Sequence, residues 1–286
     1  MSNLGDIKRR IVGVKKTQQI TRALKMVSAV KLRRAQQRIV QARPYAHRLR
    51  DILGHIAHGI NPDAHPLLDV RDPGRICYVI VTSDQGLCGS FNQNIIRRAE
   101  DEILTHTESE VEIVLIGKKS RDYFSRKGYK VIGEYVDFFK ELTFKQAVDI
   151  AELLKDLYVK EKLDRIYLVY NEFKTAAQQD VIVEQLLPII PVRPHEEKNL
   201  PEYIFEPDQI SILDRMCPNN MHIQMWRALL ESYASEMGAR LTAMEYATEN
   251  ADKLITELTM QYNRIRQENI TNEILEIVAG SEALKA

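Results

Sequence analysis

Residues 237–265, MGARLTAMEYATENADKLITELTMQYNRI, carry the pattern that decides the fold. A row of mostly apolar side chains recurs there at alternating intervals of four and three residues: Met237, Leu241, Met244, Thr248, Ala251, Ile255, Leu258, Tyr262 and Ile265. This period of 3.5 residues, sustained over about four heptads, is typical of a helix in a coiled coil. The row, called the C-terminal seam below, therefore needs a partner helix.

The helix that carries this seam is predicted to be very long. No proline follows Pro218, and the later glycines are Gly238 and Gly280. A helix from Gln209 to Ala286 would measure about 115 Å at 1.5 Å per residue. A compact protein of this chain length is only about 50 Å across. The helix must therefore project from the body of the protein.

The first sixty residues supply the predicted partner helix. One row with heptad spacing comprises Leu4, Ile7, Ile11, Val14, Gln18 and Thr21, and a second comprises Leu32, Ala35, Ile39, Ala42, Ala46, Leu49, Leu53, Ile56 and Ile60. The register is expected to slip between the two rows, and Pro44 is expected to kink the helix or to cost about 3 kcal/mol. Because the intervening chain must return, the two terminal helices are predicted to pair antiparallel.

Between the terminal helices the pattern changes to alternating strands and helices. Strands are predicted at 76–81, 111–116, 129–132, 166–170 and 181–187, and helices at 92–104, 119–127 and 143–160. This alternation favours a Rossmann-like α/β domain with a mostly parallel sheet and an antiparallel pair of strands at one edge. The predicted division is residues 1–60 for the first helix, 70–205 for the α/β domain and 209–286 for the last helix.

Charge is unevenly distributed along a chain whose net charge is zero. The first fifty residues carry fourteen Lys or Arg and one acid, Asp6, which leaves 26 basic and 39 acidic residues in the remaining 236. Such an imbalance indicates an acidic partner surface, either within this protein or on another. Nucleic-acid binding is an alternative, but no aromatic side chain precedes Tyr45 to stack on a base. An acidic protein partner or a solvated helix face is the simpler interpretation.

Targeting segments and disulfides are not expected. The first ten residues, MSNLGDIKRR, lack the apolar core of a signal peptide, and no run of eighteen apolar residues occurs. Three cysteines, Cys77, Cys88 and Cys217, are an odd number and favour reduced thiols. Membrane association is therefore expected only through a partner, without direct insertion.

The loop Ser83-Asp-Gln-Gly-Leu-Cys-Gly-Ser90 is the candidate for an enzymatic site. It follows a predicted strand and precedes a predicted helix, and it contains both a serine and a cysteine. The loop matches neither G-x-S-x-G, nor GxGxxG, nor the phosphate-binding loop with its lysine. Cys88 would need a neighbouring base to become a nucleophile. A structural strand-to-helix turn is the favoured interpretation, and an α/β enzyme the alternative.

Histidines do not form a convincing metal site. His55 and His58 lie three residues apart on a predicted helix and could share an ion, but no third ligand stands at a fixed spacing. We expect no metal and no cofactor.

The end of the last helix carries a separate apolar stripe. Ile270, Ile274 and Ile277 lie beyond the C-terminal seam at helical spacing. Apolar side chains at the end of a projecting helix should be covered by another protein. Packing against the start of the N-terminal helix is the alternative.

Three stretches together resemble the gamma subunit of bacterial rotary ATP synthases. They are TQQITRALKMVSAVKLRRAQ at 17–36, SDQGLCGSFN at 83–92, and YNRIRQ at 262–267 followed by ITNEILEIVAG at 270–280. The resemblance spans essentially the whole chain, in the same order. Gln85 stands where the family usually has arginine, which puts any salt bridge of that side chain in doubt.

This resemblance implies a rotor shaft without a catalytic site. The shaft would connect proton flow through a membrane ring of c subunits to ATP synthesis in a hexamer of alpha and beta subunits, on the cytoplasmic face of the cell membrane. The matching motif positions imply contacts of Arg266, Gln267, Thr271 and Glu273 with the beta subunit. Tyr203 and Glu206 would contact the epsilon subunit and the c-ring, and Ile270, Ile274 and Ile277 would form the bearing tip.

Overall fold

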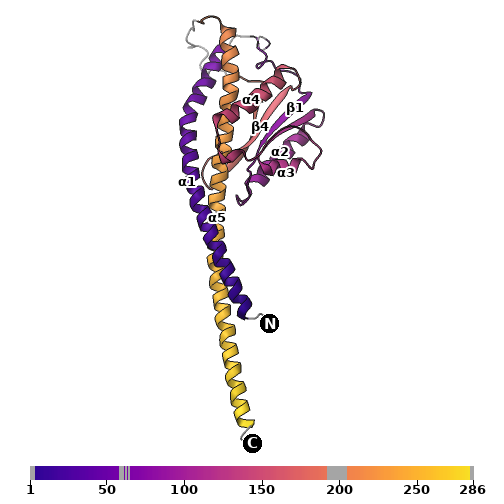
Figure 1. Ribbon diagram of the computed structural model, residues 1–286. Coiled ribbons are helices and arrows are strands. Elements are labelled where there is room, and N and C mark those ends of the chain that lie inside the picture. Colours follow the sequence, from indigo (N-terminus) through magenta and orange to yellow (C-terminus); the bar gives the residue numbers. More distant parts are fainter. Residues whose placement is uncertain (1–3, 58–60, 62, 64, 192–204, 284–286) are drawn as a thin grey trace. The chain divides into compact units, whose positions relative to one another are not determined.

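The computed structural model describes residues 4–57, 61, 63, 65–191 and 205–283 (Figure 1). The terminal helices are α1, Leu4–Ala57, and α5, Gln209–Ala283. Two compact units make up the chain: residues 1–27 with 241–286, called unit 1, and residues 28–240, called unit 2. The three-part domain division inferred from the sequence remains a prediction.

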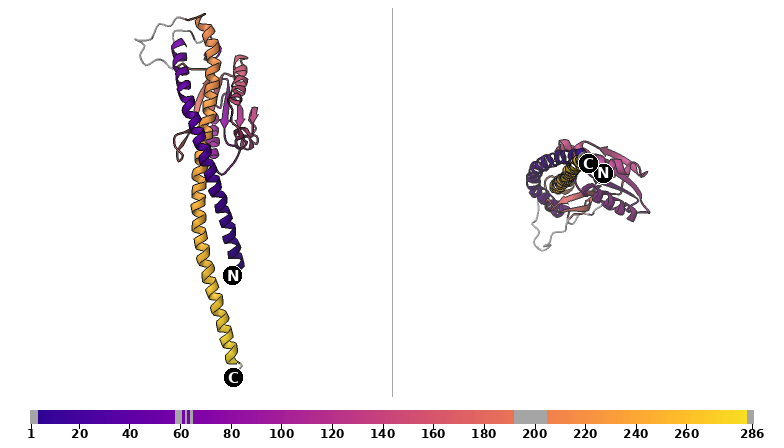
Figure 2. Two further views of the ribbon diagram at one scale, coloured as in Figure 1. Left: turned by 60° about the vertical axis from the view of Figure 1, so that its left-hand side comes forward. Right: turned by 90° about the horizontal axis from the view of Figure 1, so that it is seen from below.

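In unit 1, α1 and α5 pair through their side chains in antiparallel orientation (Figure 2). Gln18 bonds to Asp252, Thr21 to Thr248 at 2.8 Å, and Lys25 to Glu245 at 2.6 Å. The partner numbers fall along α5 as the residue numbers rise along α1, so the two helices run in opposite directions. The predicted antiparallel pairing is confirmed.

The C-terminal seam is confirmed by the burial of its residues. Within 251–281, the residues that are not exposed are Ala251, Ile255, Leu258, Tyr262 and Ile265. These are the five members of the predicted row that fall in this range. The 3.5-residue period therefore identifies the covered face of α5 residue by residue.

The predicted slip in the register of α1 is wrong. Lys25 is half-buried and Ser28 is buried, and they continue the alternation of four and three residues from Thr21 to Leu32. The row is thus continuous, and its break in the sequence arises because two polar residues occupy seam positions. Pro44 lies inside α1 and does not end the helix.

Unit 2 contains the α/β domain. Its elements are β1 (Arg75–Val81), α2 (Phe91–Thr105), β2 (Glu110–Ile116), α3 (Lys118–Phe124), β3 (Lys130–Tyr135), η2 (Phe138–Lys140), α4 (Phe144–Val159), β4 (Arg165–Phe173) and β5 (Gln179–Leu187). The strand order is β3-β2-β1-β4-β5, with β5 antiparallel to β4 and the other pairs parallel. The predicted parallel sheet with an antiparallel edge pair is confirmed.

The two faces of the sheet have different covers. Ile76, Tyr78 and Ile80 of β1 pack in one buried cluster with α2 and with Phe124 of α3. Side chains alternate along a strand, so Leu168 and Tyr170 point away from the face on which Val169 joins that cluster. Tyr170 there lies close to Arg227 of α5. One face is thus covered by α2 and α3, and the opposite face contacts α5.

Candidate functional site

The loop after β1 occupies the position where a Rossmann-like sheet binds its ligand. Strand order reverses on the two sides of β1, since β2 lies on one side and β4 on the other. The crevice at the carboxyl ends of such strands is the usual ligand site in this fold. The loop 82–90 follows β1 directly, so its contacts decide whether the crevice is open.

Hydrogen bonds tie this loop to its own domain. The carboxylate of Asp84 accepts backbone N–H groups from Lys118 at 3.1 Å and from Asp137 at 3.0 Å. The hydroxyl of Ser83 donates to the carbonyl of Gln85 at 2.6 Å. Asp84 therefore joins the starts of two later segments to the end of β1, a role that its position in the sequence does not reveal.

Cys88 does not have the surroundings of a catalytic thiol. It is buried, and its sulfur lies 3.2 Å from the side-chain nitrogen of Asn92 and 3.9 Å from the hydroxyl of Ser83. Burial raises the pKa of the Cys88 thiol and outweighs the opposing effect of Arg240. A thiol with a raised pKa is mostly protonated and is a weak nucleophile at neutral pH.

Helix α5 lies in the crevice itself. The guanidinium of Arg240 donates to the backbone carbonyls of Gln85 at 3.3 Å and Gly86 at 3.2 Å, and it pairs with Glu236 at 2.6 Å. A Cβ on Gly238 would come within 3.2 Å of Ala176, so this glycine allows the close approach of α5. Gln85 contributes its carbonyl oxygen to Arg240, which any residue at that position could supply. The ligand crevice of the fold is thus filled by the chain's own helix.

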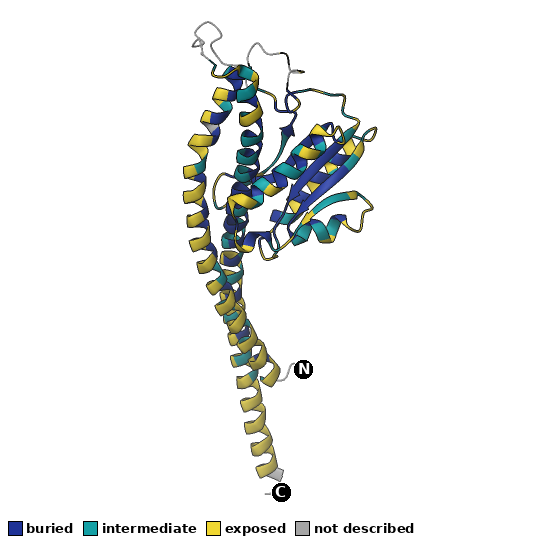
Figure 3. Cartoon of the chain, turned by 45° about the horizontal axis from the view of Figure 1, so that its top comes forward, coloured by how far each residue is buried: buried dark blue, intermediate teal, exposed yellow. Residues whose placement is uncertain are grey.

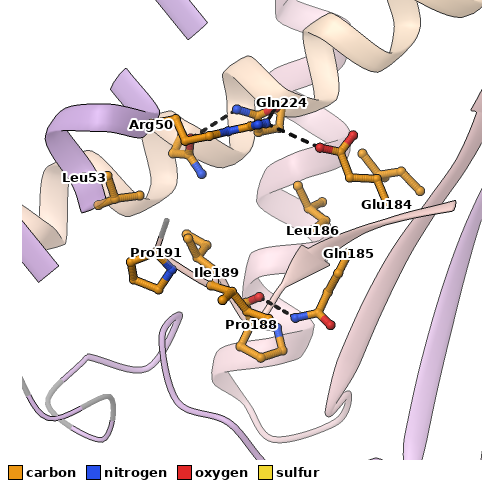
Figure 4. Close-up of a pocket in the computed structure, with 12 residues that line it drawn as sticks. Arg50, Leu53, Glu184, Gln185, Leu186, Pro188, Ile189, Pro191 and Gln224 are labelled. Carbon is orange, nitrogen blue, oxygen red and sulfur yellow. Dashed lines mark hydrogen bonds and ion pairs between the residues drawn. The ribbon is translucent and has the colours of Figure 1, made fainter. Parts of the chain in front are cut away.

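A cavity of about 200 Å³ lies between α1, α5 and the end of β5 (Figure 4). Arg50 reaches across it to Gln224 at 3.1 Å and to Glu184 at 3.4 Å, and Gln185 donates to the carbonyl of Pro188 at 2.8 Å. The hydrogen-bonding partners of Arg50 and Gln185 are other groups of the same chain. Their arrangement joins secondary-structure elements.

The end of α5 is exposed on all sides in the described residues (Figure 3). All residues from 266 to 281 are exposed, starting directly after Ile265, the last member of the seam. The apolar side chains there are between 47 and 72% exposed: Ile270, Ile274, Leu275, Ile277 and Val278. The spacing had identified the three isoleucines, whereas Leu275 and Val278 widen the apolar face. Among the described residues, packing of this stripe against the start of α1 is not observed.

The predicted contact residues at this end lie on the same uncovered segment. Arg266, Gln267, Thr271 and Glu273 are exposed, and the hydroxyl of Thr271 donates to the carbonyl of Gln267 at 2.9 Å. Glu206 is exposed ahead of α5, and Tyr203 lies outside the described residues. The structure thus groups four of the six predicted contact residues on one segment.

The described part of the chain contains neither a metal-binding cluster nor a helix that could span a membrane. No group of three or more His, Cys, Asp or Glu there could hold a metal ion. His58 lies outside that part, so the pairing of His55 and His58 is not described. None of the helices the structure describes combines the length and apolar character needed to cross a membrane.

The fold and this site define a protein with an antiparallel coiled coil, an α/β domain whose ligand crevice is filled, and an uncovered helix end. A family model described as ATP synthase matches residues 3–284. The ATP synthase gamma chains of Chlorobaculum parvum and Geotalea uraniireducens are each 45% identical to it over the full length of both chains. The chain belongs to the ATP synthase gamma chain family.

Chains in solved structures of two mitochondrial ATP synthases share this fold. A chain of the Euglena gracilis OSCP/F1/c-ring structure aligns with a TM-score of 0.74 and 22% identity, covering 98% of this chain and 94% of that chain. A chain of the Tetrahymena thermophila central stalk and c-ring structure aligns with a TM-score of 0.62 and 26% identity. The alignment covers 80% of this chain and 99% of that chain. The Euglena gracilis alignment, which covers 98% of this chain, includes both long helices and the α/β domain.

Proposed function

We propose that this chain is the central rotor shaft of an ATP synthase and has no catalytic site of its own. It couples proton flow through the c-ring of the membrane sector to ATP synthesis and hydrolysis in the hexamer of alpha and beta subunits. Membership of the gamma chain family supports this function. The observation that carries it is the exposed apolar end of α5, which is suited to a surrounding protein bearing.

The contacts with the hexamer are assigned to residues on this exposed end. Arg266, Gln267, Thr271 and Glu273 contact loops of the beta subunit, and the stripe of Ile270, Ile274 and Ile277 turns inside the bearing. Exposure of all seven side chains supports the assignment. An apolar stripe suits a sliding contact because apolar attraction has no preferred direction, whereas each hydrogen bond holds one angular position.

The other end of the shaft is assigned to the membrane sector. Tyr203 and Glu206 contact the epsilon subunit and the c-ring, at the cytoplasmic face of the cell membrane. The exposed carboxylate of Glu206, just before α5 begins, supports this assignment for that residue. Attachment is peripheral and occurs through these partners.

The two alternative functions have less support. An α/β enzyme would need an open crevice after β1, but Arg240 and Glu236 of α5 lie in it. Nucleic-acid binding would benefit from aromatic side chains that stack on bases, but none precedes Tyr45 in the basic helix. Three of its cations, Lys25, Arg43 and Arg50, also pair with carboxylates of the same chain.

Reconstitution from purified subunits tests the proposal. The chain should co-purify with alpha and beta subunits, and the complex with epsilon and c-ring should couple ATP hydrolysis to proton pumping. A truncated variant that ends at Ile265 should still fold, because its seam is complete, and should lose coupling. Equal coupling by the truncated chain, or a wild-type chain that ignores the other subunits, would contradict the rotor function.

A further inference from the structure

Glu184 of β5 joins the sheet to both long helices. One carboxylate oxygen lies 3.4 Å from Arg50 of α1, and the other accepts bonds from Arg227 of α5 and, at 2.8 Å, from the hydroxyl of Tyr170. Burial raises the pKa of Tyr170 well above its ordinary value, so its hydroxyl keeps the proton that it donates. One carboxylate thus contacts three structural elements besides its own.

Glu231 of α5 makes a second connection of the same kind. Its side chain is only 2% exposed. One oxygen accepts from Arg43 of α1, at 2.9 and 3.3 Å, and the other accepts the backbone N–H of Phe173 at the end of β4, at 3.1 Å. A buried carboxylate without a cation is strongly unfavourable, and Arg43 supplies a cation in direct contact with Glu231.

The spacing of these residues gives each helix two attachment levels. Arg43 and Arg50 are seven residues apart, two turns on one face of α1, and Arg227 and Glu231 are four residues apart, one turn on α5. A single level would let a helix pivot about the contact. Directional bonds at two levels resist rotation of each helix against the sheet. Apolar contacts resist such rotation less, because they have no preferred direction.

We propose that Arg43, Arg50, Glu184, Arg227 and Glu231, called the ionic network below, make the α/β domain and both helices turn as one body. The inference rests on the proposed rotor function and adds to it the place where torque enters the shaft. These are positioning residues, since none of them lies on the exposed end of α5. The network should set the torsional stiffness of the rotor without being needed for ATP hydrolysis.

The test uses the complete ATP synthase with Glu184→Gln and Glu231→Gln combined. Each glutamine keeps the shape and an accepting oxygen but removes the charge that holds the arginines. An exposed Glu108→Cys substitution allows a bead to be attached selectively, because the three native cysteines are buried. The angular spread of the bead is recorded while the alpha–beta hexamer is stalled. We expect the variance to rise about twofold or more, with assembly and unloaded ATPase activity retained.

Glu172→Gln is the matched control. Its carboxylate lies in the same strand region but pairs with Lys174, two residues further on, at 2.6 Å. The bead variance of this control should equal that of the wild type. An unchanged variance in the double variant, or an equal rise in the control, overturns the proposal.

A second variant covers the case in which the double variant does not assemble. Arg50→Gln removes the more distant cation of Glu184 and leaves Arg227 and Tyr170 in place. It should raise the variance in the same direction by a smaller factor, and no rise overturns the proposal. If instead the wild-type bead fails to turn with ATP, the rotor function itself is wrong.

Discussion

The hydroxyl oxygens of Thr21 and Thr248 lie 2.8 Å apart, between the two helices of unit 1. Each also lies within bonding distance of a carbonyl on its own helix, at Gln18 and Met244. A separation of 2.8 Å is that of an O–H···O hydrogen bond, and either hydroxyl can be the donor between the helices. In Thr21→Val the hydroxyl of Thr248 loses this partner, and stability should fall by about 1 kcal/mol.

A double-mutant cycle isolates this hydrogen bond. Thr21→Val combined with Thr248→Val removes both polar groups. The double variant should therefore lose less unfolding free energy than the sum of the losses in the two single variants, by about 0.5–1.5 kcal/mol. Urea unfolding of the purified chain measures the unfolding free energy of each variant. Thr259→Val is the control, since that exposed hydroxyl donates to Ile255 on its own helix. Strictly additive losses would contradict the shared bond.

The pair Lys25 and Glu245 should act through charge. Their side chains are 38% and 47% exposed, so the pair is worth at most about 1 kcal/mol. Lys25→Glu should lower stability at low salt, and adding Glu245→Lys should restore it. At about 1 M salt the Debye length falls to about 3 Å, and the differences should shrink. Equal losses at both salt concentrations would point to packing as the cause.

Much of the fold could be predicted because its signals are periodic. The C-terminal seam, the antiparallel pairing and the order of strands and helices all follow from the spacing of apolar residues. The register of α1 was the exception, since Lys25 and Ser28 occupy seam positions that an apolar pattern cannot reveal. Their role depends on residues more than 200 positions away, such as Glu245.

The candidate site was less predictable for the same reason. The isoleucines beyond Ile265 stand out because the heptad spacing ends there. Arg240, Glu184 and Glu231 look like ordinary charged residues in the sequence, and only the fold brings them to the crevice and to the ionic network. Asp84 accepts backbone groups from segments more than thirty residues later, which local sequence cannot encode.

The three cysteines should resist modification in the folded chain. Burial, with a smaller effect of Asp214, raises the pKa of Cys217 to about 12, and burial also raises the pKa values of Cys77 and Cys88. At pH 8 the thiolate fraction of Cys217 is then about a thousandfold below that of a free thiol. Alkylation followed by mass spectrometry should show slow labelling that becomes fast in urea. Rapid labelling of Cys88 in the folded chain would revive the enzyme interpretation.

Arg240 should determine how stability depends on pH. Burial raises the pKa of Glu236, and Arg240 opposes this. Arg240→Gln should raise the pKa further, so the folded state binds a proton that the unfolded state releases. Stability then falls as pH rises from the unfolded to the folded pKa of Glu236. The loss against wild type should reach about 3–5 kcal/mol at neutral pH and be smaller near pH 5.

Unfolding by urea at several pH values measures this effect. The control is Arg264→Gln, which breaks the exposed pair with Glu268 on the same helix. The stability that Arg264→Gln loses against the wild type should be small and nearly independent of pH. A loss in Arg240→Gln that stays constant from pH 5 to pH 8 would show that packing, and not the charge of Glu236, is responsible.

Arg266→Ala combined with Gln267→Ala tests the proposed contacts of the exposed end. Both side chains lie beyond the seam, so their removal should leave the coiled coil intact while affinity for the alpha–beta hexamer falls about tenfold or more. Gln261→Ala with Arg264→Ala removes the same two residue types one turn earlier, where they are also exposed. Assembly titrations with purified subunits compare the two variants. Because composition and helix propensity change equally in both, a tenfold difference must come from position. Equal affinities would place the beta-subunit contact elsewhere on the shaft.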